Sequence, residues 1–344
     1  MASFSVRPYE PGDEEGLLAL FNRVFSEGNP AFVPRTMETW RGIFLDNPAG
    51  MQTFVGLDAE RQVVANYSSI PAAAVVRGER RMCTQAVDSC VDRAWRGSLR
   101  KQSLFVTIAT EFIRHFGTEG QPSFDDFMYG MPNEQAFPIG TRIIGYKPVL
   151  VPLHALVHEL LPASAAWHAA LRAEGEAGGV RVDEFSGADV GEAAALFERH
   201  LAESPLGIWR DAPYLSWRYR PRPDVQYRAL LARRGGQLAG LVVFRMGWMG
   251  QPLVPLVDWI GPGADRAALA ALLGHVARLA QEAGARRLET WITPHTAHHA
   301  TLAALGLADE PTRFNLCIMT FGPRVDLEWA KANWFLTMGD TDIF

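Results

Sequence analysis

The sequence predicts an α/β fold, in the form of an α+β arrangement with mixed sheets, repeated in two tandem domains. The chain has 344 residues, a length that suits two domains better than one. Strand-like and helix-like segments alternate along the whole chain. The order of these segments in the first half returns in the second half, which indicates an internal duplication.

The first half begins with a predicted strand at 3–8. The helix that follows has acidic residues at its start and Leu17, Leu20 and Phe21 at helical spacing. A long helix is expected at 98–116, where apolar residues form a stripe along one face. The remaining elements of this half are strands at 51–57, 62–77 and 82–91, a strand from Phe127, a short helix at 133–144 and a closing strand at 146–157.

The second half repeats this order. Two strands within 227–246 flank Gly235-Gly236, a pair typical of a hairpin turn. Residues 265–284 read as an amphipathic helix that ends in glycine. The other elements are a strand at 180–185, a helix at 188–202, strands at 252–260 and 286–292, a short helix at 296–307 and a final strand at 314–321.

Short sequence echoes support the duplication. Thr39-Trp40-Arg41 in the first half matches Ser216-Trp217-Arg218 in the second, and Val87-Asp88 and Val257-Asp258 each precede a long helix. We therefore predict an N-terminal domain at 1–154, a connecting helix at 155–179 and a C-terminal domain with a docked tail at 180–344.

Composition narrows the classes of function and partner. Apolar residues make up 48% and charged residues 21% of the chain, and the net charge of −5 favours no nucleic-acid or membrane partner. No apolar run approaches the ~20 residues of a membrane helix, and the N-terminus lacks a signal-peptide pattern. The three cysteines are too scattered for a disulfide framework or a zinc site, so we expect a cytoplasmic protein without metal.

Four segments carry a resemblance to a known family. They are SVRPYEPGDEEGLLALFNRVF, WRGIFLDNPAG, AVDSCVDRAWRGSL and MPNEQAFPIGTRIIGYKP. Together with the order of elements, they resemble the GCN5-related N-acetyltransferase (GNAT) superfamily. The two copies resemble its tandem members, which include proteins that acetylate aminoglycosides. The resemblance implies two acyl-CoA N-acyltransferase domains.

The resemblance also implies where acetyl-CoA, or another acyl-CoA, binds. In the family a strand lends backbone groups to the pantetheine arm, and a glycine-containing turn points N–H groups at the pyrophosphate from a helix N-terminus. The matching residues are Ser89, Cys90 and Val91 of the strand and Arg96, Gly97, Ser98, Leu99, Arg100 and Lys101 of the turn. Two motif glycines are replaced, by Leu99 and Lys101. The alternative is a solvated basic helix start.

The equivalent turn of the second half, residues 261–266, departs further from the family pattern. Pro262 has no N–H group, and Asp265 would repel a phosphate. The cofactor is therefore expected in the first half alone, with the second copy serving a structural role.

The resemblance further implies direct transfer of the acyl group to a primary amine of a small molecule or peptide. The family tyrosine that protonates the leaving thiolate is absent, because its place falls on Gly140 or Thr141. Tyr129 is the nearest replacement, although a buried structural tyrosine fits equally well. Asp88 is a candidate base, but its counterpart Asp258 suggests a structural task for both.

The C-terminal segment NWFLTMGDTDIF is unusually apolar for a tail and is expected to dock. In the aminoglycoside-acetylating relatives the terminal carboxylate acts as general base, a role that Phe344 could fill here; the alternative is a terminal strand of the second sheet. Two other functions stay open: a non-catalytic acyl-CoA-binding sensor or scaffold, and a transferase using a long-chain acyl or aminoacyl-tRNA donor. The acceptor and the oligomeric state are undetermined by the sequence.

Overall fold

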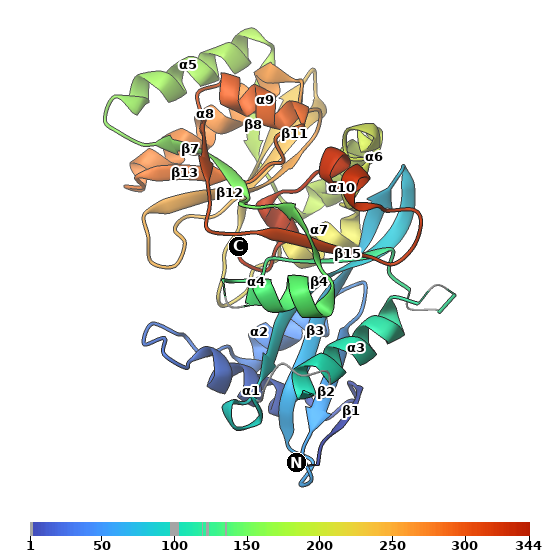
Figure 1. Ribbon diagram of the computed structural model, residues 1–344. Coiled ribbons are helices and arrows are strands. Elements are labelled where there is room, and N and C mark those ends of the chain that lie inside the picture. The colour runs from blue at the N-terminus through green and yellow to red at the C-terminus, as the bar shows by residue number, and fades with distance from the viewer. Residues whose placement is uncertain (1–2, 97–102, 119, 122–123, 135) are drawn as a thin grey trace. The chain divides into compact units, whose positions relative to one another are not determined.

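The computed structural model describes residues 3–96, 103–118, 120–121, 124–134 and 136–344. The chain forms two compact units (Figure 1). The first unit comprises Met1–Ala73, Arg81–Val151 and Phe314–Leu327, and the second comprises Ala74–Arg80, Pro152–Arg313 and Glu328–Phe344. None of the described helices is both long and apolar enough to span a lipid bilayer.

The first unit contains a mixed sheet. Its strands, in spatial order, are β1 (Ser5–Pro8), β2 (Gln52–Leu57), β3 (Val63–Val76), β4 (Glu79–Val91), β5 (Phe127–Gly130), β15 (Leu316–Thr320) and β6 (Lys147–Leu150). β4 runs parallel to β5, and β15 pairs antiparallel with both β5 and β6. The far end of β3, which belongs to the second unit, also pairs with β9 (Leu206–Ile208).

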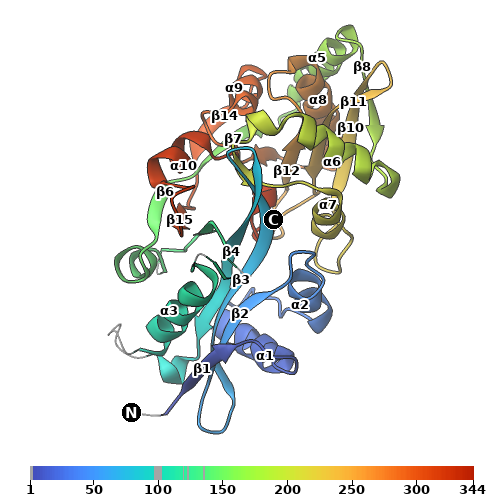
Figure 2. The same cartoon turned by 90° about the vertical axis from the view of Figure 1, so that its right-hand side faces the viewer.

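Helices cover both faces of this sheet (Figure 2). Helices α1 (Glu14–Phe25) and α2 (Met37–Phe44) lie on one face, and α3 (Leu104–Phe116) lies on the other; α4 (Ala136–Ile139) continues into a π-helical turn at Gly140–Ile144. Strand residues alternate between the two sides, as the pleat requires. On β2, Phe54 packs in the core beneath α3, while its neighbour Val55 packs with Leu17 and Trp40 of α1 and α2.

The second unit contains another mixed sheet. Its strands, in spatial order, are β14 (Ala308–Pro311), β7 (His154–Glu159), β13 (Arg287–Thr290), β12 (Leu253–Ile260), β11 (Gln237–Phe244), β10 (Arg228–Arg234) and β8 (Val180–Glu184). β12 runs parallel to β13. Its helices are α5 (Ser164–Ala177), α6 (Val190–Arg199), α7 (Ala212–Arg218), α8 (Arg266–Glu282), α9 (Ala297–Ala304) and most of α10 (Leu327–Asn333).

The two faces of the second sheet differ in what they meet. Val242 of β11 packs in the large core that includes residues of α8, such as Leu272. The next residue on the same strand, Val243, lines a pocket with Leu215 of α7. The repeated pattern of a sheet with a helix pair on one side and a long helix on the other agrees with the predicted fold class.

The pairing of strands divides the chain differently from the predicted boundaries of 1–154, 155–179 and 180–344. The strand expected at the end of the second domain is β15, whose backbone hydrogen bonds place it in the first sheet. The strand expected at 146–157 is two strands, β6 and β7, which belong to different sheets. The segment expected to connect the domains contains β7 and α5 of the second unit.

Candidate functional site

The candidate site of the first unit lies where β4 and β5 separate. Parallel pairing joins Cys83 with Phe127 and ends with Gln85 opposite Tyr129. β5 stops at Gly130, but β4 continues to Val91. Residues 87–91 therefore extend past the last residue of their parallel neighbour, and β5 offers no ladder partner to their backbone N–H and C=O groups on that side.

Asp88 lies in this stretch, in a backbone conformation that is unusual for a non-glycine residue. Its φ of 54° is left-handed and marks an irregularity in β4. Both oxygens of its carboxylate accept hydrogen bonds from the Arg35 guanidinium, one from Nη1 and one from Nη2 at 3.3 Å. The side chains of Arg35 and Asp88 are 17% and 8% exposed, so the pair borders solvent.

Arg35 lies in the loop between α1 and α2 and is held in place by residues of α1. Its main-chain N–H donates to Oδ1 of Asn22 at 2.8 Å, and Nδ2 of Asn22 donates back to its carbonyl at 3.0 Å. The guanidinium carbon lies 3.8 Å from the centre of the Phe21 ring, a cation–π contact. Arg35 is thus a fixed partner for Asp88.

The three residues of β4 that were predicted to contact acyl-CoA lie in this same stretch. Ser89 is half-buried, and its hydroxyl donates to the carbonyl of Val87 at 3.3 Å. The Cys90 thiol donates to Oδ1 of Asn66 at 2.9 Å, and burial, with the Asp88 charge adding to it, raises the pKa of that thiol. Cys90 is therefore not an activated nucleophile. Val91 packs in the core beneath α3.

Arg96 follows the strand, and its charge is already paired. Nε donates to the carbonyl of Val91 at 2.8 Å, and Nη1 and Nη2 contact the Glu27 carboxylate at 2.6 and 3.1 Å. The side chain is 42% exposed, so a phosphate could exchange with Glu27. The other predicted turn residues, Gly97, Ser98, Leu99, Arg100 and Lys101, lie outside the described residues.

Tyr129 lies at the point where the two strands separate. It is the last residue of β5 paired with β4, and it is 3% exposed. Across the other edge of β5 it faces Ile318 of β15. Its burial fits the structural alternative, and the role of proton donor remains a prediction.

The second unit repeats this arrangement. The parallel pairing of β12 and β13 ends with Pro255 opposite Glu289, three residues before Asp258, just as Gln85 comes three residues before Asp88. Arg210 binds Asp258, with Nε 3.0 Å from Oδ2 and Nη2 3.0 Å from Oδ1. Both carboxylates therefore stand at the same point of a split sheet.

The arginines also correspond. Arg35 directly precedes Thr36, the N-cap of α2, and Arg210 directly precedes Asp211, the N-cap of α7. The Arg210 guanidinium lies 5.7 Å from the Phe197 ring of α6, as Arg35 lies over a phenylalanine of α1. Neither arginine was among the predicted site residues. Their shared place before an N-cap is the signal that could have found them.

The C-terminal segment fills the split of the second unit. Thr337 forms an isolated bridge with Ile292, two residues beyond β13, and its hydroxyl donates to Oδ1 of Asp258 on β12 at 3.0 Å. Nη2 of Arg210 donates to the Thr337 hydroxyl at 3.0 Å and to Oδ1 of Asp340 at 2.9 Å. Thr337 therefore joins the two separated strands.

The same segment is held further along by its main chain. Nε of Arg218 donates to the carbonyl of Gly339, and Nη2 of Arg218 donates to the main-chain oxygen of Phe344, both at 2.9 Å. The Phe344 ring stacks on Trp248 with centroids 5.1 Å apart. The tail docks, as its apolar composition predicted; the role of Phe344 as a base remains a prediction.

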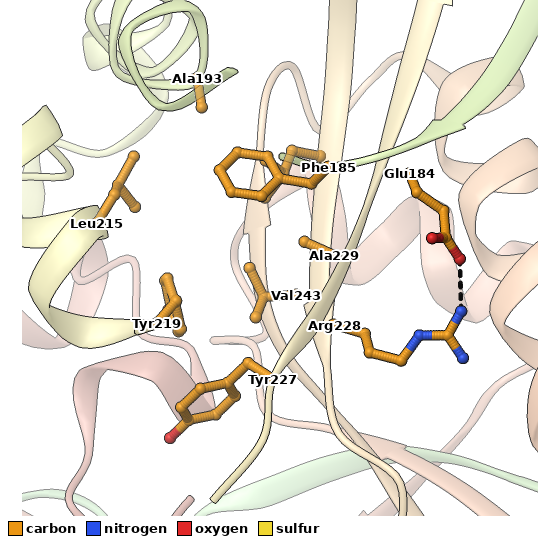
Figure 3. Close-up of a pocket in the computed structure, with 10 residues that line it drawn as sticks. Glu184, Phe185, Ala193, Leu215, Tyr219, Tyr227, Arg228, Ala229 and Val243 are labelled. Atoms are coloured by element: carbon orange, nitrogen blue, oxygen red, sulfur yellow. Dashed lines mark hydrogen bonds and ion pairs between the residues drawn. The ribbon is translucent and has the colours of Figure 1, made fainter. Parts of the chain in front are cut away.

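A separate pocket of about 190 Å³ lies in the second unit, on the side of the sheet that faces α6 and α7 (Figure 3). Leu215 of α7 and Tyr219, the C-cap of that helix, lie on one side of it, and an ion pair of 2.6 Å between Glu184 and Arg228 lies on the other. The Tyr219 hydroxyl donates to Oδ2 of Asp258 at 2.7 Å, so this wall is shared with the buried Arg210 network.

Comparisons with known proteins bear on the fold. No family model and no curated protein sequence matches the chain. Solved structures do: a GCN5-related N-acetyltransferase from Anabaena variabilis matches at 13% identity over 93% of this chain and 73% of that one, with a TM-score of 0.63. One from Kribbella flavida matches at 14% identity, 93% and 71% coverage and a TM-score of 0.61. Saccharomyces cerevisiae N-myristoyltransferase with bound myristoyl-CoA matches at 14% identity, 93% and 83% coverage and a TM-score of 0.59.

Proposed function

Since the chain has the tandem fold of the GCN5-related N-acyltransferases, we propose that it transfers an acetyl or other acyl group from acyl-CoA to a primary amine. The acceptor would be a small molecule or a peptide. The observation that carries this proposal is the separation of β4 from β5 after Tyr129, beside the left-handed Asp88. The three free cysteines are buried, which suits a reducing compartment such as the cytoplasm.

In this proposal the backbone of Ser89, Cys90 and Val91 binds the pantetheine arm, and Arg96 and the residues after it bind the pyrophosphate. The N–H groups of an unpaired strand polarise a thioester carbonyl because they point at the oxygen on which negative charge develops. The first unit is the better candidate for the donor, because the tail occupies the split of the second unit.

The transfer itself needs no covalent enzyme intermediate. The neutral amine attacks the thioester carbon, a C–N bond forms and the C–S bond breaks. The amine gives up a proton and the sulfur takes one, so the products are the amide and free CoA. Asp88 would accept the amine proton, and Tyr129 would protonate the sulfur.

Isothermal titration with acetyl-CoA and with myristoyl-CoA tests the donor site. We expect dissociation constants on the order of micromolar for the accepted donor. Arg96→Glu should weaken binding strongly, because it places a second carboxylate beside Glu27 where the pyrophosphate would lie. Arg181→Glu is the matched control, since Arg181 is 75% exposed and lies in the second unit.

Each outcome separates the alternatives. Binding of myristoyl-CoA but not acetyl-CoA would make a long-chain acyl group the donor, a possibility favoured by the match to N-myristoyltransferase. Binding without release of CoA thiol across a wide panel of amines would instead indicate a non-catalytic sensor. No binding of either compound would reject the proposal.

A further inference from the structure

The duplicated Arg–Asp pair is fully covered in one unit and borders solvent in the other. Arg210 and Asp258 have side chains that are 0% exposed, because the C-terminal segment lies over them. Arg35 and Asp88 keep 17% and 8% of their side-chain surface exposed. The second unit therefore shows what kind of group such a pair accepts.

The covering groups are a hydrogen-bond donor and a carboxylate. The Thr337 hydroxyl donates to the Asp258 carboxylate at 3.0 Å. The Asp340 carboxylate accepts from Arg210 at 2.9 Å, while Arg210 keeps its bonds to Asp258. One guanidinium thus binds two carboxylates at once, which its five N–H groups allow.

We propose that the Arg35–Asp88 pair binds an acceptor that carries a carboxylate beside its amine, as an amino acid does. The carboxylate would bind Arg35, as Asp340 binds Arg210, and the amino group would donate to Asp88, as Thr337 donates to Asp258. This assignment rests on the proposed function, because it names the acceptor class of the same site. It adds Arg35 as a residue that sets specificity.

The position of the pair brings this amine to the donor. Asp88 comes three residues after Gln85, where the pairing of β4 with β5 ends, so a group bound to its carboxylate lies beside the split. Asn22 and Phe21 fix Arg35 before any ligand binds. A guanidinium that is already fixed in this way loses little conformational entropy when it binds a carboxylate.

The first unit is less suited to an extended peptide like the tail of this chain. In the second unit the hydroxyl of Tyr214 and the guanidinium of Arg218 donate to the carbonyl of Gly339. These residues are the third and seventh after the N-cap of α7, and the same positions after the N-cap of α2 are Thr39 and Ile43. Isoleucine has no donor, so this position of α2 cannot repeat the bond that Arg218 makes, and Arg41, the match of Arg218 in the sequence echo, lies two residues closer to its N-cap. A small amino carboxylate fits better.

The test measures release of CoA thiol by the full chain, using the acyl-CoA that binds in the titration. Common L-amino acids are compared with their own carboxamides, which keep the amine and lose the negative charge. We expect an accepted amino acid to have a KM about tenfold or more below that of its amide. Arg35→Gln should raise the KM of the acid about 10- to 100-fold and that of the amide much less.

Three controls separate binding from folding and from the donor site. Arg114→Gln changes an arginine that is 68% exposed on α3 and should leave both KM values unchanged. Arg35→Lys should recover part of the loss, because it restores the charge without the fork of donors. Titration of acyl-CoA into Arg35→Gln should give the wild-type dissociation constant.

The proposal is overturned if amides are accepted as well as acids, or if Arg35→Gln raises both KM values equally. It is also overturned if acyl-CoA binds and no amino acid is accepted, an outcome that leaves the proposed function intact. Failure of acyl-CoA to bind the wild type would instead reject the proposed function itself.

Discussion

The first and second units place an arginine directly before a helix N-cap and pair it with an aspartate at a split in the sheet. In the second unit the chain's own tail supplies the remaining partners of this pair. In the first unit the same pair borders solvent. One duplicated Arg–Asp pair is therefore part of a buried core, while the other borders solvent.

The largest difference between the two Arg–Asp pairs should be in their contribution to stability. Arg210→Leu leaves Asp258 and Asp340 buried without their counter-charge, so we expect it to lower the free energy of unfolding by about 3–5 kcal/mol. Arg35→Leu should cost less, about 1–2 kcal/mol, because the pair borders solvent and water can reach Asp88 once the guanidinium is gone. Urea unfolding followed by tryptophan fluorescence measures both, and equal losses would contradict the comparison.

A smaller effect should appear in the way the free energy of unfolding depends on pH. Burial, reinforced by Asp258 and opposed by Arg210, raises the pKa of Asp340 to about 6. A carboxyl whose pKa is higher in the folded state binds protons on folding, so it lowers stability as pH rises from about 4 to about 6. Asp340→Asn should flatten this part of the decline, because an amide does not titrate.

The measurement is urea unfolding of the wild type and of Asp340→Asn at a series of pH values. The quantity to compare is the slope of the free energy of unfolding against pH. Its absolute value also changes, because the substitution alters the hydrogen bond that Asp340 accepts from the main chain of Thr337. Asp125 in the first unit, whose pKa burial raises to about 7, adds its own decline that the variant should keep. Parallel curves for the two proteins would argue against a proton on Asp340.

The smallest expected effect concerns the hydroxyl that covers the second pair. Thr337→Val keeps the shape of the side chain but removes its bonds with Asp258 and Arg210, at a cost of about 1–2 kcal/mol. Ser89→Ala in the first unit should change stability by about 0.5 kcal/mol or less, because Ser89 is half-buried and its hydroxyl bond is long. A larger loss of unfolding free energy for Ser89→Ala would show that this part of the first unit is as deeply buried as its counterpart in the second.

The sequence predicted the elements with clear periodicity. The apolar stripe of α3 identifies a buried face before any partner is known. The docking of the tail followed from its apolar composition, and Phe344 is 3% exposed. In these cases the local sequence pattern was sufficient to predict which residues are buried.

Other features depend on partners that are distant in sequence. The segment LCIMT of β15 identifies a strand, but nothing in it specifies the sheet that it joins. Arg35 and Arg210 lie in loops without periodicity, and only their contacts with Asp88 and Asp258 show their role. Sequence reasoning found the two aspartates because they repeat on strands, and it missed the arginines that make them pairs.

The position of β15 has a consequence for synthesis on the ribosome. β15 lies between β5 and β6, yet residues 316–320 are made after β14, long after both of its neighbours. While the nascent chain is shorter than this, β5 and β6 lack their common partner and expose unpaired backbone. The sheet of the first unit therefore cannot be completed until most of the second unit has been translated. Because this pairing joins residues far apart in the sequence, we expect folding of the first unit to be slow and to depend on chaperones.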